Sequence, residues 1–372
     1  MTGRTFIIAE IGTSHNGDLA KADELIASAA SSGADCAKFQ AVYADEIIHP
    51  ATGEVPLPGG PTSLYDRFQK LERPIEFYAE LKERTQRYGL QFLCTPFGVR
   101  SARMLRSLSI AALKIASPEL NHVPLLREVA KYGLPVYLSA GVSLLADIEE
   151  AMAELGSTPV TLLHCVTSYP APPEDYNLRL LPVLSALFGV PIGVSDHTLD
   201  PIIIPVLAVS RGASVIEKHI TLSRSSDGLD DPVALEPADF HRMTRAVRAA
   251  ETGMAADGPE RVVADIEKTY GVAVVRAVLG TGKKSLAPSE LASYGRTNRS
   301  IHALRTLAAG KCLESADVAV LRTEKILTPG IHPRYLQKIL GKRLTRDVEA
   351  GEGIGWVDLL VECEDVDAKN PR

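Results

Sequence analysis

The sequence predicts an α/β fold, a (β/α)8 TIM barrel followed by a small β-rich module. Three observations predict the barrel. Eight short apolar runs alternate with amphipathic stretches of helical length, the eight units span roughly 250 residues, and a polar residue closes each run. That span is typical of a (β/α)8 barrel. A doubly wound open sheet is the alternative, but no glycine fingerprint for it follows the first run.

The expected elements alternate regularly along the chain. Near-continuous apolar runs are typical of parallel strands that are covered by helices. The expected strands are Phe6–Ile11, Asp35–Phe39, Leu90–Cys94, Ala112–Ile115, Val136–Leu138, Thr161–His164, Ile192–Val194 and Val215–Glu217. The expected helices are Leu19–Ser32, Pro74–Tyr88, Val99–Leu108, Pro124–Tyr132, Leu144–Leu155, Pro201–Arg211 and Pro237–Ala255. A Pro- and Gly-rich stretch, residues 47–61, breaks the spacing and has the composition of a lid or specificity loop.

The chain divides into four expected parts. Residues 1–256 form the barrel, 257–296 form a linker with one further helix at 266–278, 297–362 form the β-rich module and 363–372 form a polar tail. A module of about 65 residues is near the lower limit for a free-standing domain. We therefore expect it to lean on the barrel or on a neighbouring subunit.

Composition excludes several classes of function. The chain has 372 residues and a net charge of −6, and no basic run interleaved with aromatic residues suggests a nucleic-acid partner. The longest apolar stretch, residues 201–209, is too short for a membrane span. The first residues lack a signal-peptide pattern. Five scattered cysteines without a CxxC pair argue against a disulfide scaffold or a cysteine zinc site, and favour a cytoplasmic location.

Polar side chains close the apolar runs. In chain order they are Glu10, Lys38 (with Gln40), Thr95, Lys114 (with Ser117), Ser139, His164, Ser195 (with His197) and His219. In a barrel such residues converge on the C-terminal mouth, where barrel enzymes build their sites. The lysines and hydroxyls indicate a site for a phosphorylated, carboxylated anion. Alternatively, each hydroxyl is the N-cap of the next helix.

Two histidines close the last two strands. His197 and His219 on neighbouring strand ends can share one divalent ion, with water or substrate oxygens at the open positions. Such an ion would polarise a carbonyl group. The alternative is that each is a hydrogen-bonded histidine without a ligand. The carboxylates of Glu10 and Glu217, expected at the same mouth, favour the metal.

Ordered motifs along nearly the whole chain carry a family resemblance. They are residues 8–18 (IAEIGTSHNGD), 37–40 (AKFQ), 94–97 (CTPF), 114–119 (KIASPE), 138–141 (LSAG), 163–165 (LHC), 169–170 (YP), 193–198 (GVSDHT) and 216–219 (IEKH). This part resembles the sialic acid synthase family, which includes N-acetylneuraminate, legionaminate and pseudaminate synthases and spore-coat polysaccharide proteins. Residues 299–301 (RSI), 308–311 (AAGK), 339–342 (ILGK) and 346–352 (RDVEAGE) resemble the SAF (antifreeze-like, β-clip) domain of those enzymes.

The resemblance implies a transferase that condenses phosphoenolpyruvate (PEP) with an N-acylated amino sugar. The acceptor would be N-acetylmannosamine or a 2,4-diacetamido-trideoxyhexose, and the products a nine-carbon 2-keto-3-deoxy sugar acid and phosphate. It also implies a domain-swapped homodimer in which one chain's C-terminal module closes the other's barrel.

The resemblance also implies a role for each site residue. PEP would be held by Lys38, Thr95, Lys114, Ser117, Ser139 and Ser195. The catalytic set would be Glu10, His197, Glu217 and His219. His197 and His219 would bind the divalent metal, Mn²⁺ by preference, with Mg²⁺ or Co²⁺ as alternatives. The sugar would be contacted by Gln40, Glu119, Tyr169, Asp230 and Arg322.

The departures from the family pattern lie on the sugar side. Ser14 precedes His15 where asparagine is usual, residues 228–234 keep Asp230 but lack the usual histidine and serine, and the loop after Arg322 is lengthened. We therefore expect the PEP chemistry to be retained and the acceptor to differ. Two alternatives stay open. One is a PEP aldol synthase for another acceptor; a phosphorylated one would require basic residues that the strand ends do not show. The other is a non-catalytic glycan-binding homologue.

Overall fold

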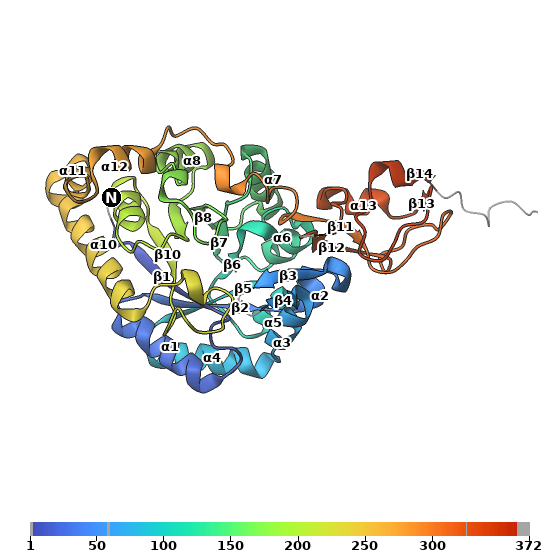
Figure 1. Cartoon of the computed structure of the whole chain (residues 1–372), viewed down its shortest axis with the longest axis horizontal. Coiled ribbons are helices and arrows are strands. Elements are labelled where there is room, and N and C mark those ends of the chain that lie inside the picture. Colours follow the sequence, from blue (N-terminus) through green and yellow to red (C-terminus); the bar gives the residue numbers. More distant parts are fainter. Residues whose placement is uncertain (1–2, 58–59, 325, 363–372) are drawn as a thin grey trace, which may run out of the picture.

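Eight parallel strands form one sheet that curls into a barrel, as the sequence predicts (Figure 1). The structure is a computed structural model and describes residues 3–57, 60–324 and 326–362. In sheet order the strands are β5 (Gln91–Pro96), β2 (Cys36–Ala41), β1 (Phe6–Gly12), β10 (Val215–His219), β9 (Ile192–Asp196), β8 (Val160–Cys165), β7 (Val136–Ser139) and β6 (Leu113–Ile115). The two end strands, β5 and β6, lie against each other and close the ring.

Helices cover the outside of the sheet and bury its outer face. They are α1 (Leu19–Ser31), α4 (Ile75–Arg87), α5 (Val99–Ser107), α6 (Val123–Ala130), α7 (Leu145–Leu155), α8 (Leu180–Phe188), α9 (Ile203–Ser210) and α10 (Pro237–Asp257). The apolar core lies between this helical layer and the strands. None of the helices in the described part of the chain is long and apolar enough to span a membrane.

In the barrel and the linker, the helical expectations differ from the structure at two places. The helix α8, between β8 and β9, is not among the expected helices, because that segment is apolar on nearly every side and shows no amphipathic period. The single helix expected at 266–278 is instead two, α11 (Pro259–Tyr270) and α12 (Val272–Leu279). Gly271 separates them with a φ of 85°, a backbone conformation that does not continue a helix.

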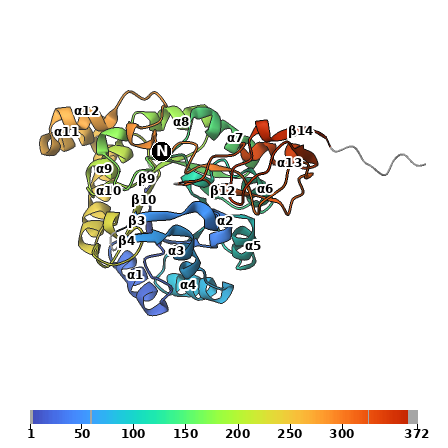
Figure 2. The ribbon, with the colours of Figure 1, turned by 45° about the vertical axis from the view of Figure 1, so that its right-hand side comes forward.

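The long insertion after β2 folds into a small unit beside the barrel mouth. It consists of α2 (Ala44–Ile47), a hairpin of β3 (Glu54–Leu57) and β4 (Gly60–Ser63), and α3 (Leu64–Leu71). Figure 2 shows these elements side by side, with α3 below the hairpin. Ile47 and Phe68, from the two helices, form an apolar cluster with Phe97 of the barrel.

The C-terminal module is built from two antiparallel strand pairs. They are β11 (Arg299–Ala303) with β12 (Val318–Arg322), and β13 (Lys342–Leu344) with β14 (Leu359–Glu362). A short helix, α13 (Leu336–Ile339), completes the module. It has its own core around Ile301, Val348 and Ile354. It lies to one side of the barrel (Figure 1), and Ile48 of the insertion forms a bridge to Arg322 of β12.

The cysteines only partly follow the expectation from their spacing. Cys36, Cys94 and Cys165 are buried free thiols. Cys312 is disulfide-bonded, and the scattered positions of the cysteines gave no sign of this bond.

Gly193 is required where β9 pairs with β10. A Cβ atom at this position would lie 2.5 Å from the Val215 carbonyl oxygen and 2.7 Å from Leu163 Cδ2. We expect Gly193→Ala to lower the free energy of unfolding by about 1–3 kcal/mol, because paired strands must move apart. Chemical denaturation measures this change. Gly3→Ala is the control, since no atom lies within 4 Å of its Cβ; equal stabilities of the two variants would contradict the prediction.

Candidate active site

The inside of the barrel has an apolar lower layer and a polar upper layer. Ile8, Cys36, Leu93, Ala112, Leu163 and Val215 form the lower layer. Side chains two residues apart on a strand share a face. The next inward-facing residues are therefore Glu10, Lys38, Thr95, Lys114, Cys165 and Glu217, and all of them line one cavity of about 350 Å³ at the C-terminal mouth. The alternation of side chains along each strand thus brings the predicted charged residues together in one cavity.

The same cavity shows how the site residues expected from the sequence are placed. "Site residues" here means the fifteen positions named from the sequence, and fourteen of them line the cavity. They are Glu10, Lys38, Gln40, Thr95, Lys114, Ser117, Ser139, Tyr169, Ser195, His197, Glu217, His219, Asp230 and Arg322. Glu119, expected to contact the sugar, does not line it.

Lys38 is at the centre of a network of charged side chains in the cavity. Its Nζ lies 2.8 Å from Glu10 Oε2 and 3.6 Å from Glu217 Oε1. It also donates to Thr95 Oγ1 at 3.4 Å. Burial opposes the charge of Lys38, but Glu10 and Glu217 outweigh this effect and raise its pKa. The Lys38 ammonium is therefore charged at neutral pH.

Lys114 stands on the other side of Glu217. Its Nζ donates to Ser139 Oγ at 2.7 Å and lies 3.9 Å from Glu217 Oε1. Burial lowers the pKa of Lys114, although Glu217 opposes this shift. Burial also opposes the charge of Glu217, but Lys114 and Lys38 lower its pKa to about 2. Two buried ammonium groups therefore share a single carboxylate oxygen, which leaves donor capacity for an incoming anion.

The hydroxyl groups of the cavity are not helix caps. The N-cap positions of the α-helices that follow them are Gly98, His122, Leu144 and Ile202. Ser195 Oγ instead donates to Glu217 Oε1 at 2.9 Å, and Ser117 Oγ accepts from the Gly141 amide at 3.0 Å. The N-cap alternative is therefore wrong for these hydroxyls, and they belong to the cavity.

The two histidines lie side by side at the cavity wall. Their ring centroids are 5.6 Å apart. His197 Nδ1 donates to the Val166 carbonyl oxygen at 2.8 Å, so its Nε2 carries the lone pair in the neutral ring. Burial lowers the pKa of both imidazoles, against the effect of neighbouring carboxylates such as Asp230. Both rings are therefore neutral at pH 7, the form that binds metals.

These residues fit a divalent ion that the protein holds through two ligands. A metal-binding histidine usually donates its second ring nitrogen to a carbonyl or carboxylate oxygen, as His197 does here. No group of three or more His, Cys, Asp or Glu side chains has metal-binding geometry among residues 3–57, 60–324 and 326–362. Water and substrate oxygens would have to complete the coordination of an ion at His197 and His219.

The expected sugar-side residues border the same cavity. Gln40 Nε2 donates to Glu10 Oε1 at 2.7 Å, and the Tyr169 ring stacks on His197 with a centroid distance of 4.2 Å. Asp230 Oδ2 lies 3.9 Å from His219 Nδ1. Arg322, from β12 of the C-terminal module, also lines this cavity and lies over the Phe97 ring.

Glu119 lies beneath the cavity. It is fully buried in the short 3-10 helix Ser117–Glu119, and its Oε1 accepts from Arg322 Nη2 at 2.7 Å and from Arg299 Nη2 at 2.9 Å. Its carboxylate is therefore bound by two guanidinium groups, and it orients Arg322 rather than facing the cavity.

Sequence reasoning missed several residues and misplaced one. Phe68, Phe97, Thr167 and Thr297 line the cavity, but they come from connecting segments whose position the strand pattern does not give. The prediction that His164 lies at the mouth is wrong by one residue. Cys165 faces the cavity, and His164 faces away from it. The sequence could have shown this, because Leu163 and Cys165 share one face of the strand and His164 lies on the other.

Comparison with known proteins identifies the family of this chain. The model of the NeuB family matches residues 25–258. The chain belongs to the NeuB family. The SAF domain model matches residues 298–360, so this member carries the SAF module that the sequence predicts.

Relatives of known name cover nearly the whole chain. The spore coat polysaccharide biosynthesis protein SpsE of Bacillus subtilis is 34% identical over 363 residues, which are 96% of this chain and 94% of that protein. The N,N'-diacetyllegionaminic acid synthase of Legionella pneumophila is 34% identical over 362 residues, 94% and 93% of the two chains. The crystal structure of B. subtilis SpsE has a TM-score of 0.80 and 33% identity, and the match covers 97% of this chain and 96% of that one.

Proposed function

We propose that this NeuB family member condenses PEP with an N-acylated amino sugar to a nine-carbon 2-keto-3-deoxy sugar acid and phosphate. The observation that carries the proposal is the meeting of Lys38, Lys114, His197 and His219 in one cavity of about 350 Å³. Relatives named as N,N'-diacetyllegionaminic acid synthase and pseudaminic acid synthase support the same reaction class.

PEP would bind at the lysine side of the cavity. Its phosphate and carboxylate need charged donors, which Lys38 and Lys114 supply. Thr95, Ser117, Ser139 and Ser195 add hydroxyl groups around them. Because Ser139 and Ser195 already bond to Lys114 and Glu217, their orientation is fixed before the substrate arrives.

The charge balance of the site favours the proposed metal. Four cationic side chains in and under the cavity face four carboxylates; they are Lys38, Lys114, Arg299 and Arg322, and Glu10, Glu119, Glu217 and Asp230. A multiply charged anion therefore gains little from the protein charges alone. A divalent ion at His197 and His219, Mn²⁺ by preference, would add positive charge and polarise the aldehyde of the open-chain sugar.

The reaction balances with one water molecule. Carbon 3 of PEP bonds to the aldehyde carbon, and the aldehyde oxygen takes a proton to become a hydroxyl. Water adds to carbon 2, the C–O bond to phosphate breaks, and the ketone forms. Glu10 lies next to Lys38 and is placed to accept a proton from the attacking water. Glu217 keeps the two lysines and Ser195 in position.

The acceptor would lie on the side of Gln40, Tyr169, Asp230 and Arg322. Glu119 takes the role of a positioning residue for Arg322, in place of the direct sugar contact expected from the sequence. A domain-swapped homodimer and a cytoplasmic location stay predictions of the resemblance and the composition.

Mass spectrometry of reaction products tests the proposal. With PEP, Mn²⁺ and a panel of N-acylhexosamines and 2,4-diacetamido sugars, we expect a product heavier than one acceptor by the pyruvate unit, with equimolar phosphate. Chelation should abolish product formation, and added Mn²⁺ should restore it. If no acceptor consumes PEP in the presence of Mn²⁺, Mg²⁺ or Co²⁺, the proposal is wrong and a glycan-binding role becomes the better explanation.

A further inference from the structure

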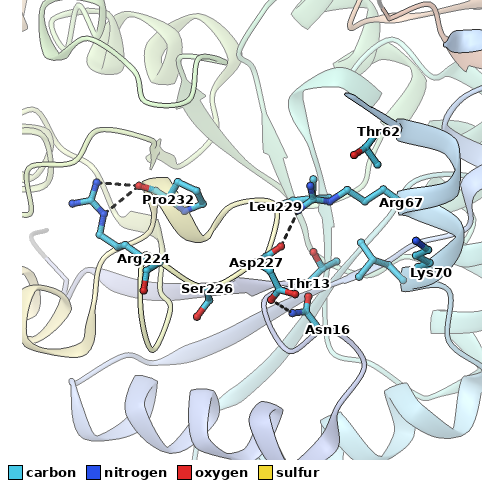
Figure 3. A pocket seen from close by; sticks show the side chains of 13 residues that line it. Thr13, Asn16, Thr62, Arg67, Lys70, Arg224, Ser226, Asp227, Leu229 and Pro232 are labelled. Atoms are coloured by element: carbon cyan, nitrogen blue, oxygen red, sulfur yellow. Dashed lines mark hydrogen bonds between the residues drawn. The ribbon is translucent and has the colours of Figure 1, made fainter. Parts of the chain in front are cut away.

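A second, larger cavity lies next to the catalytic one. It has a volume of about 660 Å³ and lies between α3 and the loop of residues 224–232, beside Thr13 and Asn16 of the segment after β1 (Figure 3). We call it the outer pocket. Leu229 lines both cavities, and the next residue, Asp230, lines the catalytic one. On α3, Phe68 borders the catalytic cavity, while Arg67 and Lys70 border the outer pocket.

The outer pocket is cationic. Arg67, Lys70 and Arg224 line it, and none of the three forms an ion pair with a carboxylate in the described part of the chain. The guanidinium of Arg67 donates to the Asp227 carbonyl oxygen at 2.8 Å, and that of Arg224 donates to the Pro232 carbonyl oxygen. These bonds use neutral acceptors and leave the positive charges uncompensated.

One carboxylate also lines the outer pocket. Asp227 Oδ1 accepts from Asn16 Nδ2 at 2.7 Å, which ties the loop to the segment after β1 (Figure 3). Three cations and one carboxylate leave a net positive lining. The ammonium of Lys70 has no hydrogen-bond or ion-pair partner among the described residues, so it is free to meet a ligand.

We propose that the outer pocket binds an anionic group, a phosphate or a carboxylate, on the carbon of the acceptor sugar that lies furthest from its aldehyde. This inference rests on the proposed function and names the acceptor class. In the proposed reaction the aldehyde lies near His197 and His219. Asp230 lies 3.9 Å from His219, and the adjacent Leu229 borders both cavities, so a sugar that extends along this wall reaches the outer pocket. The loop that forms this wall carries the departure at residues 228–234 noted in the sequence.

The basic residues for a second anionic group of the acceptor do not come from the strand ends. The structure brings Arg67 and Lys70 to the mouth from a helix in the insertion, and Arg224 from the last barrel loop.

Lys70→Met tests the inference with three acceptors. They are an N-acylhexosamine, its 6-phosphate and the uronic acid that has a carboxylate at carbon 6. We expect kcat/KM to be at least tenfold higher for a charged acceptor than for the neutral one, and the two charged sugars show which anion is preferred. Lys70→Met should reduce this advantage by about tenfold or more, through the KM of the acceptor. The KM of PEP and the rate with the neutral sugar should not change.

Two control variants show whether the effect depends on a positive charge at position 70 itself. Lys70→Arg should restore most of the preference. Arg245→Met removes an exposed cation at another cavity, which α10 forms with residues 31–33, and should have no effect. Equal kcat/KM for neutral and charged acceptors, or an equal loss for all three in Lys70→Met, would overturn the inference and leave the proposed function standing.

A binding measurement keeps the inference testable without turnover. Calorimetry gives the Kd of the N-acylhexosamine 6-phosphate for the wild type and for Lys70→Met. We expect binding of the phosphate sugar by the wild type and a Kd about tenfold higher in the variant. If no acceptor consumes PEP, the proposed function fails. If the 6-phosphate binds both proteins equally or neither, the outer pocket is not its site.

Discussion

Replacement of Lys38 by methionine is expected to reduce kcat/KM for PEP by roughly 10²–10⁴-fold. Lys38 contributes one of two ammonium groups in the cavity, and methionine fills a similar volume without donors. Steady-state phosphate release measures the loss. The effect should appear with every acceptor, because the proposed role of Lys38 is to bind PEP and not the sugar.

The same variant should also be less stable by about 3–5 kcal/mol at neutral pH, because it leaves buried carboxylates unpaired. Glu10 would retain only the Gln40 hydrogen bond, and Glu217 would retain Lys114 and Ser195. The pKa of Glu217 is about 2 in the folded protein, below its ordinary value of 4.5. Its stabilising effect is therefore present above pH 4.5 and is lost as the pH falls toward 2. The stability gap between the two proteins should narrow over that range.

Lys114→Met is the matched comparison. It should impair catalysis to a similar degree, but destabilise the protein less, because Glu217 keeps Lys38 at 3.6 Å and Glu10 keeps its ion pair. Urea denaturation of both variants distinguishes the two effects. Wild-type kcat/KM in either variant would rule out the proposed PEP site, and equal stability losses would contradict the central place of Lys38 in the network.

Replacement of Arg299 by methionine is expected to lower the free energy of unfolding by about 3–5 kcal/mol. The guanidinium is fully buried where the C-terminal module meets the barrel. It donates to Glu119 Oε1, to the Phe97 carbonyl at 2.7 Å and to the carbonyls of Ile47 and Val320 at 3.2 and 3.3 Å. These acceptors belong to the barrel, the insertion and β12. Loss of these hydrogen bonds should weaken the packing of the module on the barrel. Faster hydrogen exchange in β11 and β12 would detect this change.

Two further variants define the cause of that loss. Arg299→Lys keeps the charge, but a single ammonium group cannot reach all the acceptors, so we expect only partial rescue. Arg305→Met removes an arginine of the same module whose side chain is 63% exposed. Its buried partner Asp317 keeps Lys311 at 3.4 Å and the Glu314 amide at 2.8 Å, so the loss of stability should be much smaller than for Arg299→Met. Equal effects of Arg299→Met and Arg305→Met would show that the buried guanidinium does not hold the module to the barrel.

The repeating parts of this protein could be predicted from its sequence. A strand buried on both faces must be apolar nearly throughout, so the eight apolar runs mark the eight strands. The same runs predict the mouth residues, because all parallel strands end at one edge. The prediction fails at His164, where the inward position belongs to Cys165, since a shift of one residue reverses the face. It also fails for α8, whose apolar sequence has no amphipathic period.

The sequence by itself determined the barrel, the lysines and the histidines of its mouth, because these follow from local period and from topology. Only the tertiary structure decided the contacts between distant segments. It joined Arg299 to Glu119 and withdrew that carboxylate from the cavity, and it brought Arg67, Lys70 and Arg224 around one outer pocket. No local pattern encodes such contacts, since they depend on how an insertion and a terminal module pack against the barrel.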